Sequence, residues 1–233
     1  MQINISDIPI TLIQKKIKSI RLVVYPSREV RVSAPLRMSI SEITKFISSK
    51  INWVKEKREK FIGHNYQKKI PQKYLAGEKH YFFGEEYVLE ILEEKSSSAF
   101  ILKDKTIFLK IKKGSTINLR KKVIESWYRK ELKKIIPKYI AEFEPKMQVR
   151  VKEFGVKKMK TRWGTCNPTA QRIWLNLELA KKPISCLEYI VVHEMVHLLE
   201  RNHSKKFFAH MDEFLPHWKQ CKHTLNCNNS NFI

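Results

Sequence analysis

Three of the chain's eight histidines lie within eleven residues, in the segment VVHEMVHLLERNH at positions 191–203. His193 and His197 are four residues apart, so on a helix their imidazole rings project from one face, one turn apart. Two ring nitrogens at that separation can bind one tetrahedral metal ion. Glu194 is rotated by about 100° around the helix, where its carboxylate can reach a metal-bound water without binding the metal itself. This is the His-Glu-x-x-His pattern of zinc-dependent hydrolases, and it predicts Zn²⁺ as cofactor and Glu194 as general base.

A catalytic zinc usually has three protein ligands and one open position. His203 is the candidate third ligand, provided that the chain turns back at Arg201 and Asn202. The spacing from His197 equals that of metzincins, but Glu200 occupies the position of their turn glycine. We therefore expect a longer helix and a fold other than that of metzincins. Four further residues are candidates for the fourth position or for contacts to the ligands: His210, Asp212, Glu213 and His217.

Apolar residues surround these histidines on nearly every side of the predicted helix, which indicates a helix in the protein core. Histidine and glutamate side chains are costly to bury unless a partner satisfies them, and a metal ion would satisfy them together. The alternative is a group of core histidines that bind no metal. The third histidine at a matching position favours the metal site.

Strand and helix patterns alternate in the N-terminal half of the chain. Runs rich in β-branched residues predict short strands within residues 10–35 and 78–111. Between them, Ser39 and Glu42 form a Ser-x-x-Glu capping box that begins one helix, which runs to about residue 61. This half is therefore predicted to be rich in β-strands, with one helix.

The C-terminal half begins with a helical pattern over residues 116–143, which Pro137 is expected to kink or break. Strands follow, and then the histidine-bearing helix. A second capping box, formed by Ser185 and Glu188, is predicted near the start of that helix. Asn202 is expected to end it in the left-handed conformation. Ser204 is expected to cap a further helix that follows.

These elements predict an α+β fold in two parts. Residues 1–115 would form a β-rich N-terminal region, with a linker or crossing loop at 63–77. Residues 116–233 would form the second part, with the HExxH helix in its core. The sequence shows no internal repeat and no low-complexity segment.

The chain carries a formal net charge of +23, which favours anionic partners such as nucleic acid or nucleotides. Lysine is spread along the chain rather than clustered, so solvation of helix faces explains the charge equally well. The densest basic group lies on the predicted helix 116–143. A nucleic-acid-binding module with a structural zinc therefore stands as one hypothesis.

The chain contains no apolar run long enough to span a membrane and does not begin with a signal-peptide pattern. We therefore expect a cytoplasmic protein without a membrane partner. The four cysteines form no CxxC pair and are expected to be free thiols. Cys221, His223 and Cys227 could suggest a second metal site, but their spacing fits no standard pattern.

Several segments together resemble the YgjP-like metal-dependent hydrolase family, which is related to the WLM and SprT-like zinc metallopeptidases. They are KTRWGTCNP, RIWLNLELAKKP, the histidine helix with the Asn202-His203-Ser204 turn, and FLPHW. The similarity is close over residues 160–218 and looser in the N-terminal half. Thr165 and Cys166 stand where the family is expected to have Gly-Ser-Cys or similar, which leaves the metal site untouched.

The resemblance implies that His193, His197 and His203 bind zinc and that Glu194 is the general base. It also implies that residues 116–233 form a compact zincin-like metallopeptidase domain, in which a small sheet packs on helices. It leaves the substrate open, because members are described either as metallopeptidases or as nucleoside triphosphate (UTP) pyrophosphatases. It is also compatible with a protease recruited to DNA, because the family tends to occur beside restriction-modification genes. A peptide or protein substrate is favoured, since a three-histidine zinc site suits acyl transfer better than phosphoanhydride hydrolysis.

Three residues before the helix are candidates for the substrate cleft: Arg162, Trp163 and Asn176. Arg162 would stabilise the developing oxyanion or would be a simple surface cation, and Trp163 would line the cleft or belong to the core. The strand around residues 174–177 is expected at the cleft edge, where an extended peptide could pair with it by β-addition.

Overall fold

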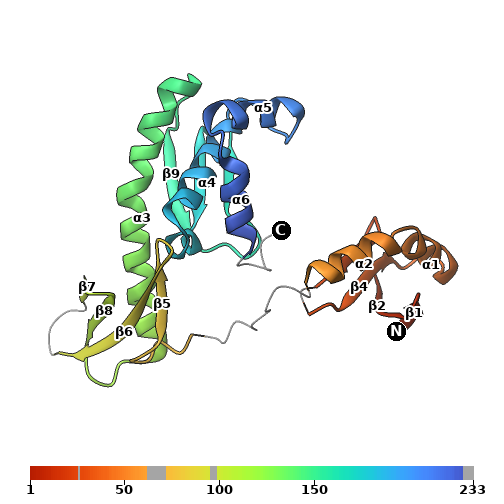
Figure 1. Ribbon diagram of the computed structural model, residues 1–233, viewed down its shortest axis with the longest axis horizontal. Coiled ribbons are helices and arrows are strands. Elements are labelled where there is room, and N and C mark those ends of the chain that lie inside the picture. The colour runs from red at the N-terminus through yellow and green to blue at the C-terminus, as the bar shows by residue number, and fades with distance from the viewer. Residues whose placement is uncertain (26, 62–71, 95–98, 228–233) are drawn as a thin grey trace. The chain divides into compact units, whose positions relative to one another are not determined.

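The computed structural model describes residues 1–25, 27–61, 72–94 and 99–227 (Figure 1). The chain forms two compact units, Met1–Pro71 and Gln72–Ile233, each with its own buried core. Both units contain strands and helices, so the predicted α+β class is confirmed. The division differs from the predicted one at 115/116, because the strands of residues 79–111 share the core of the second unit. The linker predicted at 63–77 lies mostly outside the described residues.

The first unit is a four-stranded sheet covered on one face by two helices. Its strands are β1 (Gln2–Ile5), β2 (Ile8–Lys15), β3 (Arg21–Val24) and β4 (Val30–Pro35), in the order β1-β2-β4-β3. Alternate residues such as Ile10 and Val32 are fully buried, as the period of a half-buried strand requires. They pack against Ile43 and Ile47 of the covering helices.

The helix predicted over 39–61 is present as two consecutive helices, α1 (Ile40–Ser49) and α2 (Ile51–Lys60). The capping box at its start is confirmed: the Ser39 hydroxyl accepts from the Glu42 amide, and the Glu42 carboxylate accepts from the Ser39 amide. The division falls at Lys50, whose φ of −111° and ψ of 8° depart from helical values.

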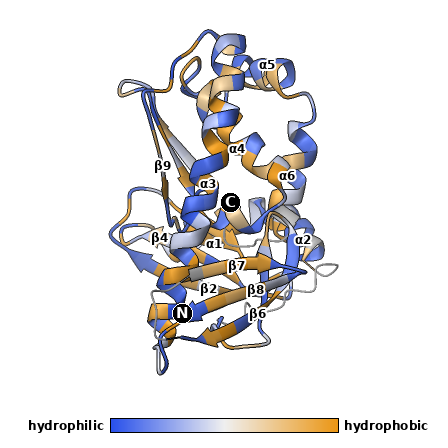
Figure 2. Ribbon diagram, turned by 90° about the vertical axis from the view of Figure 1, so that its left-hand side faces the viewer, coloured by the Kyte–Doolittle hydropathy of each residue, from blue (hydrophilic) through white to orange (hydrophobic). Residues whose placement is uncertain are grey.

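The second unit begins with another four-stranded sheet, made of β5 (Lys79–Phe82), β6 (Glu85–Glu93), β7 (Ala99–Lys103) and β8 (Thr106–Ile111). Its strands alternate hydrophobic and hydrophilic residues (Figure 2). The inner face packs on α3 (Ile117–Met147). Of the kink or break predicted at Pro137, the break does not occur, because the helix continues to Met147. Pro137 is exposed, so the carbonyl that its missing N–H leaves unpaired lies on the solvent side of the helix.

The two four-stranded sheets have the same architecture. Both have a first hairpin, a parallel central pair and a second hairpin, in the orders β1-β2-β4-β3 and β5-β6-β8-β7. A helix begins directly after each sheet. Ser6 of the first tight turn corresponds to Phe83, and Ile40 at the helix start corresponds to Ile117; both pairs are 77 residues apart. The chain therefore contains a structural repeat that its sequence does not show.

The remainder of the second unit is built around one buried helix, α4 (Ile184–Val196). A three-stranded sheet packs on α4 in the order β10-β11-β9, formed by β9 (Glu153–Lys157), β10 (Gly164–Asn167) and β11 (Arg172–Asn176). The 3₁₀ helix η1 (Leu177–Lys181) leads from β11 towards α4.

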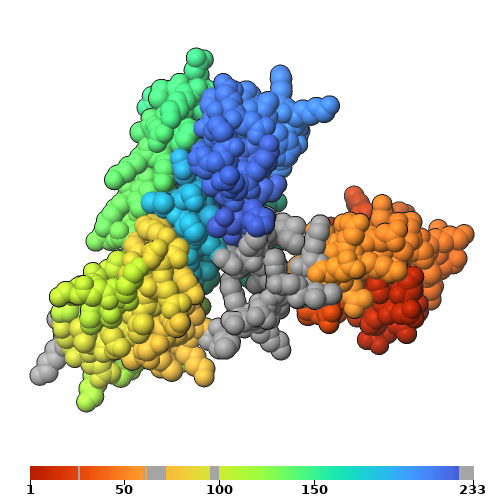
Figure 3. All heavy atoms as spheres, viewed as in Figure 1, coloured from red at the N-terminus to blue at the C-terminus, as the bar shows by residue number. Residues whose placement is uncertain are grey.

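Two short helices, α5 (Lys205–Phe214) and α6 (Trp218–Cys227), complete the covering of α4 together with α3. In the space-filling view, α3 in green and the C-terminal helices in blue form one continuous surface (Figure 3). None of the described helices combines the length and the apolar character that crossing a membrane requires.

The ends of α4 differ from the predicted ones. The N-cap is Pro183 and makes no side-chain hydrogen bond, so the predicted capping box at Ser185 is wrong. The helix stops at Val196 instead of continuing to Asn202, because the amides of Leu198 and Leu199 bond three residues back and tighten the last turn. Asn202 is not left-handed. The early stop brings the following loop back towards the helix.

Separate cores predict separate responses to core mutations. Ile10→Ala opens a cavity in the first unit, and Leu109→Ala opens one in the second; both side chains are fully buried. We expect each substitution to destabilise its own unit by about 2–5 kcal/mol. Calorimetric unfolding should show one transition lowered by Ile10→Ala and another lowered by Leu109→Ala. A single transition that both substitutions lower equally would contradict the division.

Candidate metal centre

The structure brings His193, His197 and His203 together at one point. One ring nitrogen of each histidine lies within 4.8 Å of those of the other two. The Nε2 atoms of His193 and His203 are 3.0 Å apart. A tetrahedral zinc ion with Zn–N bonds near 2.0–2.1 Å holds two ligand nitrogens about 3.3 Å apart. The donor set therefore has the size, the chemistry and the number of ligands of a catalytic zinc site.

The surroundings of the rings favour neutral imidazoles, which is the form that binds metal. Burial, with help from the neighbouring histidines and Lys222, lowers the pKa of His193 to about 3. Burial, followed by His197 and Lys222, also lowers the pKa of His203. Nδ1 of His197 lies 3.0 Å from the Glu200 carbonyl oxygen, which can only accept. Nδ1 therefore carries the hydrogen, and Nε2 keeps its lone pair for a metal.

Phe207 forms the floor beneath the three histidines. Its ring centre lies 4.9 Å from that of His193, 4.7 Å from that of His197 and 4.6 Å from that of His203. The side chain is 1% exposed and belongs to the main core. The predicted cap at Ser204 holds it in place, since the Ser204 hydroxyl accepts from the Phe207 amide at the start of α5. The His203 loop is thus tied to the core directly behind the ligand.

Glu194 lies beside the histidines with its side chain turned towards β10. It is 4% exposed, and burial raises the pKa of its carboxyl to about 8, although Arg162 opposes that shift. A Cβ atom at Gly164 would lie 2.5 Å from Oε1 of Glu194. Only glycine at position 164 leaves room for this carboxylate. A cation beside the carboxylate would favour its ionised form.

A cleft of about 850 Å³ opens over the histidines and Glu194. Arg162 and Trp163 line it, as predicted, with Arg162 exposed and Trp163 9% exposed within the core. The cleft is also lined by Tyr189, which the sequence analysis did not select. Its position four residues before His193 places it on the same face of α4, a signal that the helical spacing contained.

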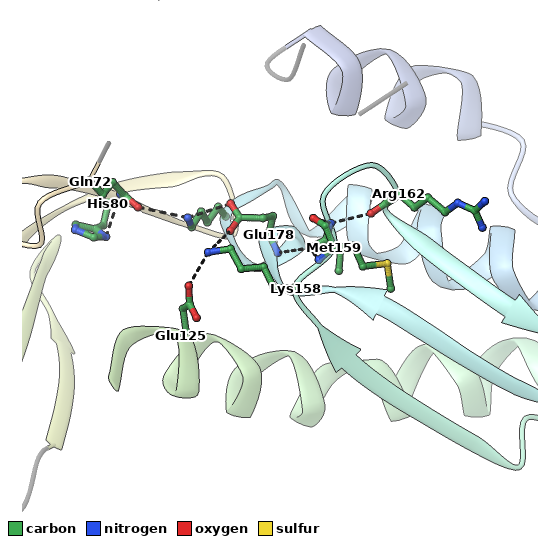
Figure 4. Close-up of polar contacts among 9 residues, drawn as sticks. Gln72, His80, Glu125, Lys158, Met159, Arg162 and Glu178 are labelled. Carbon is green, nitrogen blue, oxygen red and sulfur yellow. Dashed lines mark hydrogen bonds and ion pairs between the residues drawn. The ribbon is translucent and has the colours of Figure 1, made fainter. Parts of the chain in front are cut away.

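Asn176 does not line the cleft; it is fully buried and holds the loop that does. Its Oδ1 accepts from the amides of Met159 and Glu178, each at 3.2 Å. Its Nδ2 donates to the carbonyls of Met159 at 3.1 Å and Arg162 at 2.7 Å. Figure 4 shows three of the partner residues, Met159, Arg162 and Glu178. Glu178 also belongs to an ion-pair network with Lys158 and Glu125. Asn176 therefore fixes the backbone from which Arg162 projects.

The strand at the cleft edge is β10, not the predicted strand around residues 174–177. β11 lies between β9 and β10, so both of its edges are already hydrogen-bonded. Within the described residues, β10 pairs only with β11, and its residues Gly164, Thr165 and Cys166 line the cleft. Strand order depends on the fold, and the sequence of one strand does not reveal it.

The residues proposed for a fourth ligand lie elsewhere. The indole of Trp218 donates to Asp212 at 2.8 Å, His210 faces Glu213 at 3.6 Å, and His217 lies 3.9 Å from Glu188. Among the described residues, three histidines alone form a group that could hold a metal.

The cysteines of the described chain are free. Cys166, Cys186 and Cys221 form no disulfide, as predicted. Cys221 is buried, with its carbonyl oxygen 3.8 Å from the Cys186 sulfur, and it belongs to no metal-binding group of the described residues. The side chain of Cys227 lies outside the described residues.

The family of the chain follows from comparison with known domains. The model of the YgjP-like metallopeptidase domain matches residues 18–228, which is most of the chain. The chain belongs to the YgjP-like family. This YgjP-like protein is thus a member of a metallopeptidase family, whose domains act with a metal ion on peptides or proteins.

Among solved structures, the YgjP-like chain is similar to the metallopeptidase zymogen abylysin of Pyrococcus abyssi. The identity is 14% and the TM-score 0.38, over 42% of this chain and 99% of that one. No curated protein matches the chain.

Replacing Asn176 tests its positioning role. Asn176→Ala removes four hydrogen bonds and takes their side-chain partner from backbone groups of Met159, Arg162 and Glu178. We expect a loss of about 3 kcal/mol in the free energy of unfolding, measured by chemical denaturation. Asn167→Ala, at an exposed turn with a single hydrogen bond, is the control and should cost less than about 1 kcal/mol. Equal losses in the two variants would contradict the role.

Proposed function

We propose that this YgjP-like protein is a zinc-dependent peptidase in which Glu194 is the general base. The observation that carries this proposal is the convergence of three histidine ring nitrogens beside one buried carboxylate, in an open cleft. His193, His197 and His203 would hold the ion. Three nitrogen donors with the remaining position open to a cleft are typical of catalytic zinc, whereas structural zinc has four protein ligands.

The chemistry divides between the ion and the side chains around it. When bound, zinc lowers the pKa of a coordinated water and polarises the scissile carbonyl. Glu194 accepts the proton of the attacking water at its carboxylate and then donates it to the leaving amine. Burial suits Glu194 to this task, because a carboxyl group whose pKa lies near neutrality can both take up and release a proton.

The substrate would lie along the free edge of β10. An extended peptide there can hydrogen-bond to the strand backbone and present its carbonyl groups to the histidines and Glu194. Arg162 and Tyr189 line the same cleft and are candidates for stabilising the developing negative charge on the carbonyl oxygen. The hydroxyl of Tyr189 stays protonated, because burial raises its pKa.

The substitution Glu194→Gln tests the general base. The amide has the same shape but cannot accept the proton, so we expect zinc to remain bound and kcat to fall by at least about 100-fold. Metal content by mass spectrometry and cleavage of a peptide library are the measurements. Undiminished cleavage would remove Glu194 from the reaction. UTP hydrolysis that depends on Glu194, without peptide cleavage, would replace the peptidase with a pyrophosphatase.

The substitution Gly164→Ala tests the placement of the carboxylate. The added methyl group overlaps Oε1 of Glu194 and must displace it, while the histidines are untouched. We expect zinc affinity within about twofold of wild type and kcat/KM lower by at least about tenfold. Gly114→Ala is the control for glycine replacement: it strains the backbone at a φ of +74° outside the cleft lining, and kcat/KM should stay unchanged. A fully active Gly164→Ala enzyme would show that Glu194 needs no such fixed position.

A further inference from the structure

Three cationic side chains line the metal cleft, and each comes from a different part of the second unit. Arg162 precedes β10, Arg201 lies in the loop between α4 and α5, and Lys222 lies on α6. All three are exposed. The single carboxylate in the lining is that of Glu194, which is buried and assigned to the reaction. The exposed side chains of the cleft lining therefore include three positive charges and no carboxylate.

None of these three cations is neutralised by a carboxylate within the described part of the chain. Arg201 donates to the Thr169 hydroxyl at 3.4 Å, and the Lys222 nitrogen lies 5.5 Å from the centre of the Trp218 ring. Lys219, on the same helix as Lys222 but outside the cleft lining, pairs with Asp212 at 3.1 Å. The three cations of the cleft can therefore bind a negatively charged ligand, whereas the neighbouring Lys219 is already paired with Asp212.

The charges also act on the reacting groups. Arg162 lies close enough to the Glu194 carboxylate, and Lys222 close enough to the rings of His193 and His203, for their charges to act on these groups. A bound metal ion would add to the same positive potential. Clefts lined by charge of one sign concentrate ligands of the opposite sign and select among them.

We propose that the cleft selects peptides with acidic side chains on both sides of the scissile bond, and that Arg162, Arg201 and Lys222 determine this specificity. The proposal rests on the proposed peptidase function. Successive side chains of a peptide extended along β10 point to opposite sides, so cations contributed by three different elements around the cleft match an extended acidic peptide.

The test compares three peptides that share one scissile bond and carry Glu, Gln or Lys at the flanking positions. For the wild-type enzyme we expect kcat/KM for the Glu peptide to exceed that for the Gln peptide by about tenfold, because each partly exposed ion pair contributes a factor of about 2–5. The Lys peptide should be the poorest. The preference for the Glu peptide should weaken as the salt concentration rises from about 0.05 to about 0.5 M, because salt screens the attraction between exposed charges.

Charge reversal identifies the residues. Lys222→Glu and Arg201→Glu should each lower kcat/KM for the Glu peptide at least fivefold and raise that for the Lys peptide. Lys138→Glu changes the net charge equally from an exposed position on α3 outside the cleft and should leave the ratio unchanged. Zinc content and circular dichroism of each variant confirm the fold, and two independent reversals keep the test valid if one fails to fold.

Two results would overturn the proposal in distinguishable ways. Equal kcat/KM for the Glu and Gln peptides in the wild-type enzyme would remove the acidic preference. Equal shifts in Lys138→Glu and Lys222→Glu would remove the assignment of that preference to the cleft residues. Both results leave the peptidase intact. Absence of cleavage of every peptide by the zinc-loaded wild-type enzyme would remove the peptidase itself, and turnover of UTP under those conditions would assign the cations to phosphate groups.

Discussion

The free-energy cost of burying polar side chains of the apolar helix α4 constrains the structure of the second unit. α4 is covered by a sheet and by three helices, so its histidines and Glu194 lose most of their contact with water. Such groups are tolerated in a core only when partners satisfy them. The short helix, the returning loop and the Phe207 floor place His203 where three nitrogens converge. The packing of the core around α4 therefore also determines the positions of the three histidines.

The cleft wall opposite α4 depends on two residues that do no chemistry. Gly164 lacks a side chain where the Glu194 carboxylate lies, and Asn176 gathers the loop before β10 with four hydrogen bonds. Both act through the position of the backbone. This explains why the segment around Arg162-Trp163-Gly164 is tied to the metal helix although the two are about thirty residues apart in sequence.

Local patterns predicted what depends on local geometry. The convergence of the i, i+4 histidines with His203 and the caps at Ser39 and Ser204 follow from helix spacing and capping chemistry, and the structure contains all of them. Features that depend on packing were missed. The central place of β11 is a property of strand order, the early end of α4 depends on its loop, and the role of Asn176 depends on a loop folded against it. The repeated sheet escaped notice because topology is preserved there without matching side chains.

The first turn of the repeated sheet differs between the two copies in whether it contacts other elements of its unit. In the second copy this turn is Phe83-Gly84; the Phe83 amide donates to the Ala180 carbonyl at 2.8 Å, and Gly84 lies against Pro183. In the first copy the same turn is Ser6-Asp7, and both residues are exposed. The same backbone conformation is therefore used in two ways. Phe83-Gly84 packs against neighbouring elements, with no side chain at the contact with Pro183, whereas Ser6-Asp7 is polar and exposed. These two turn residues therefore distinguish the sheet that packs on η1 and α4 of the second unit from the sheet that forms the first unit.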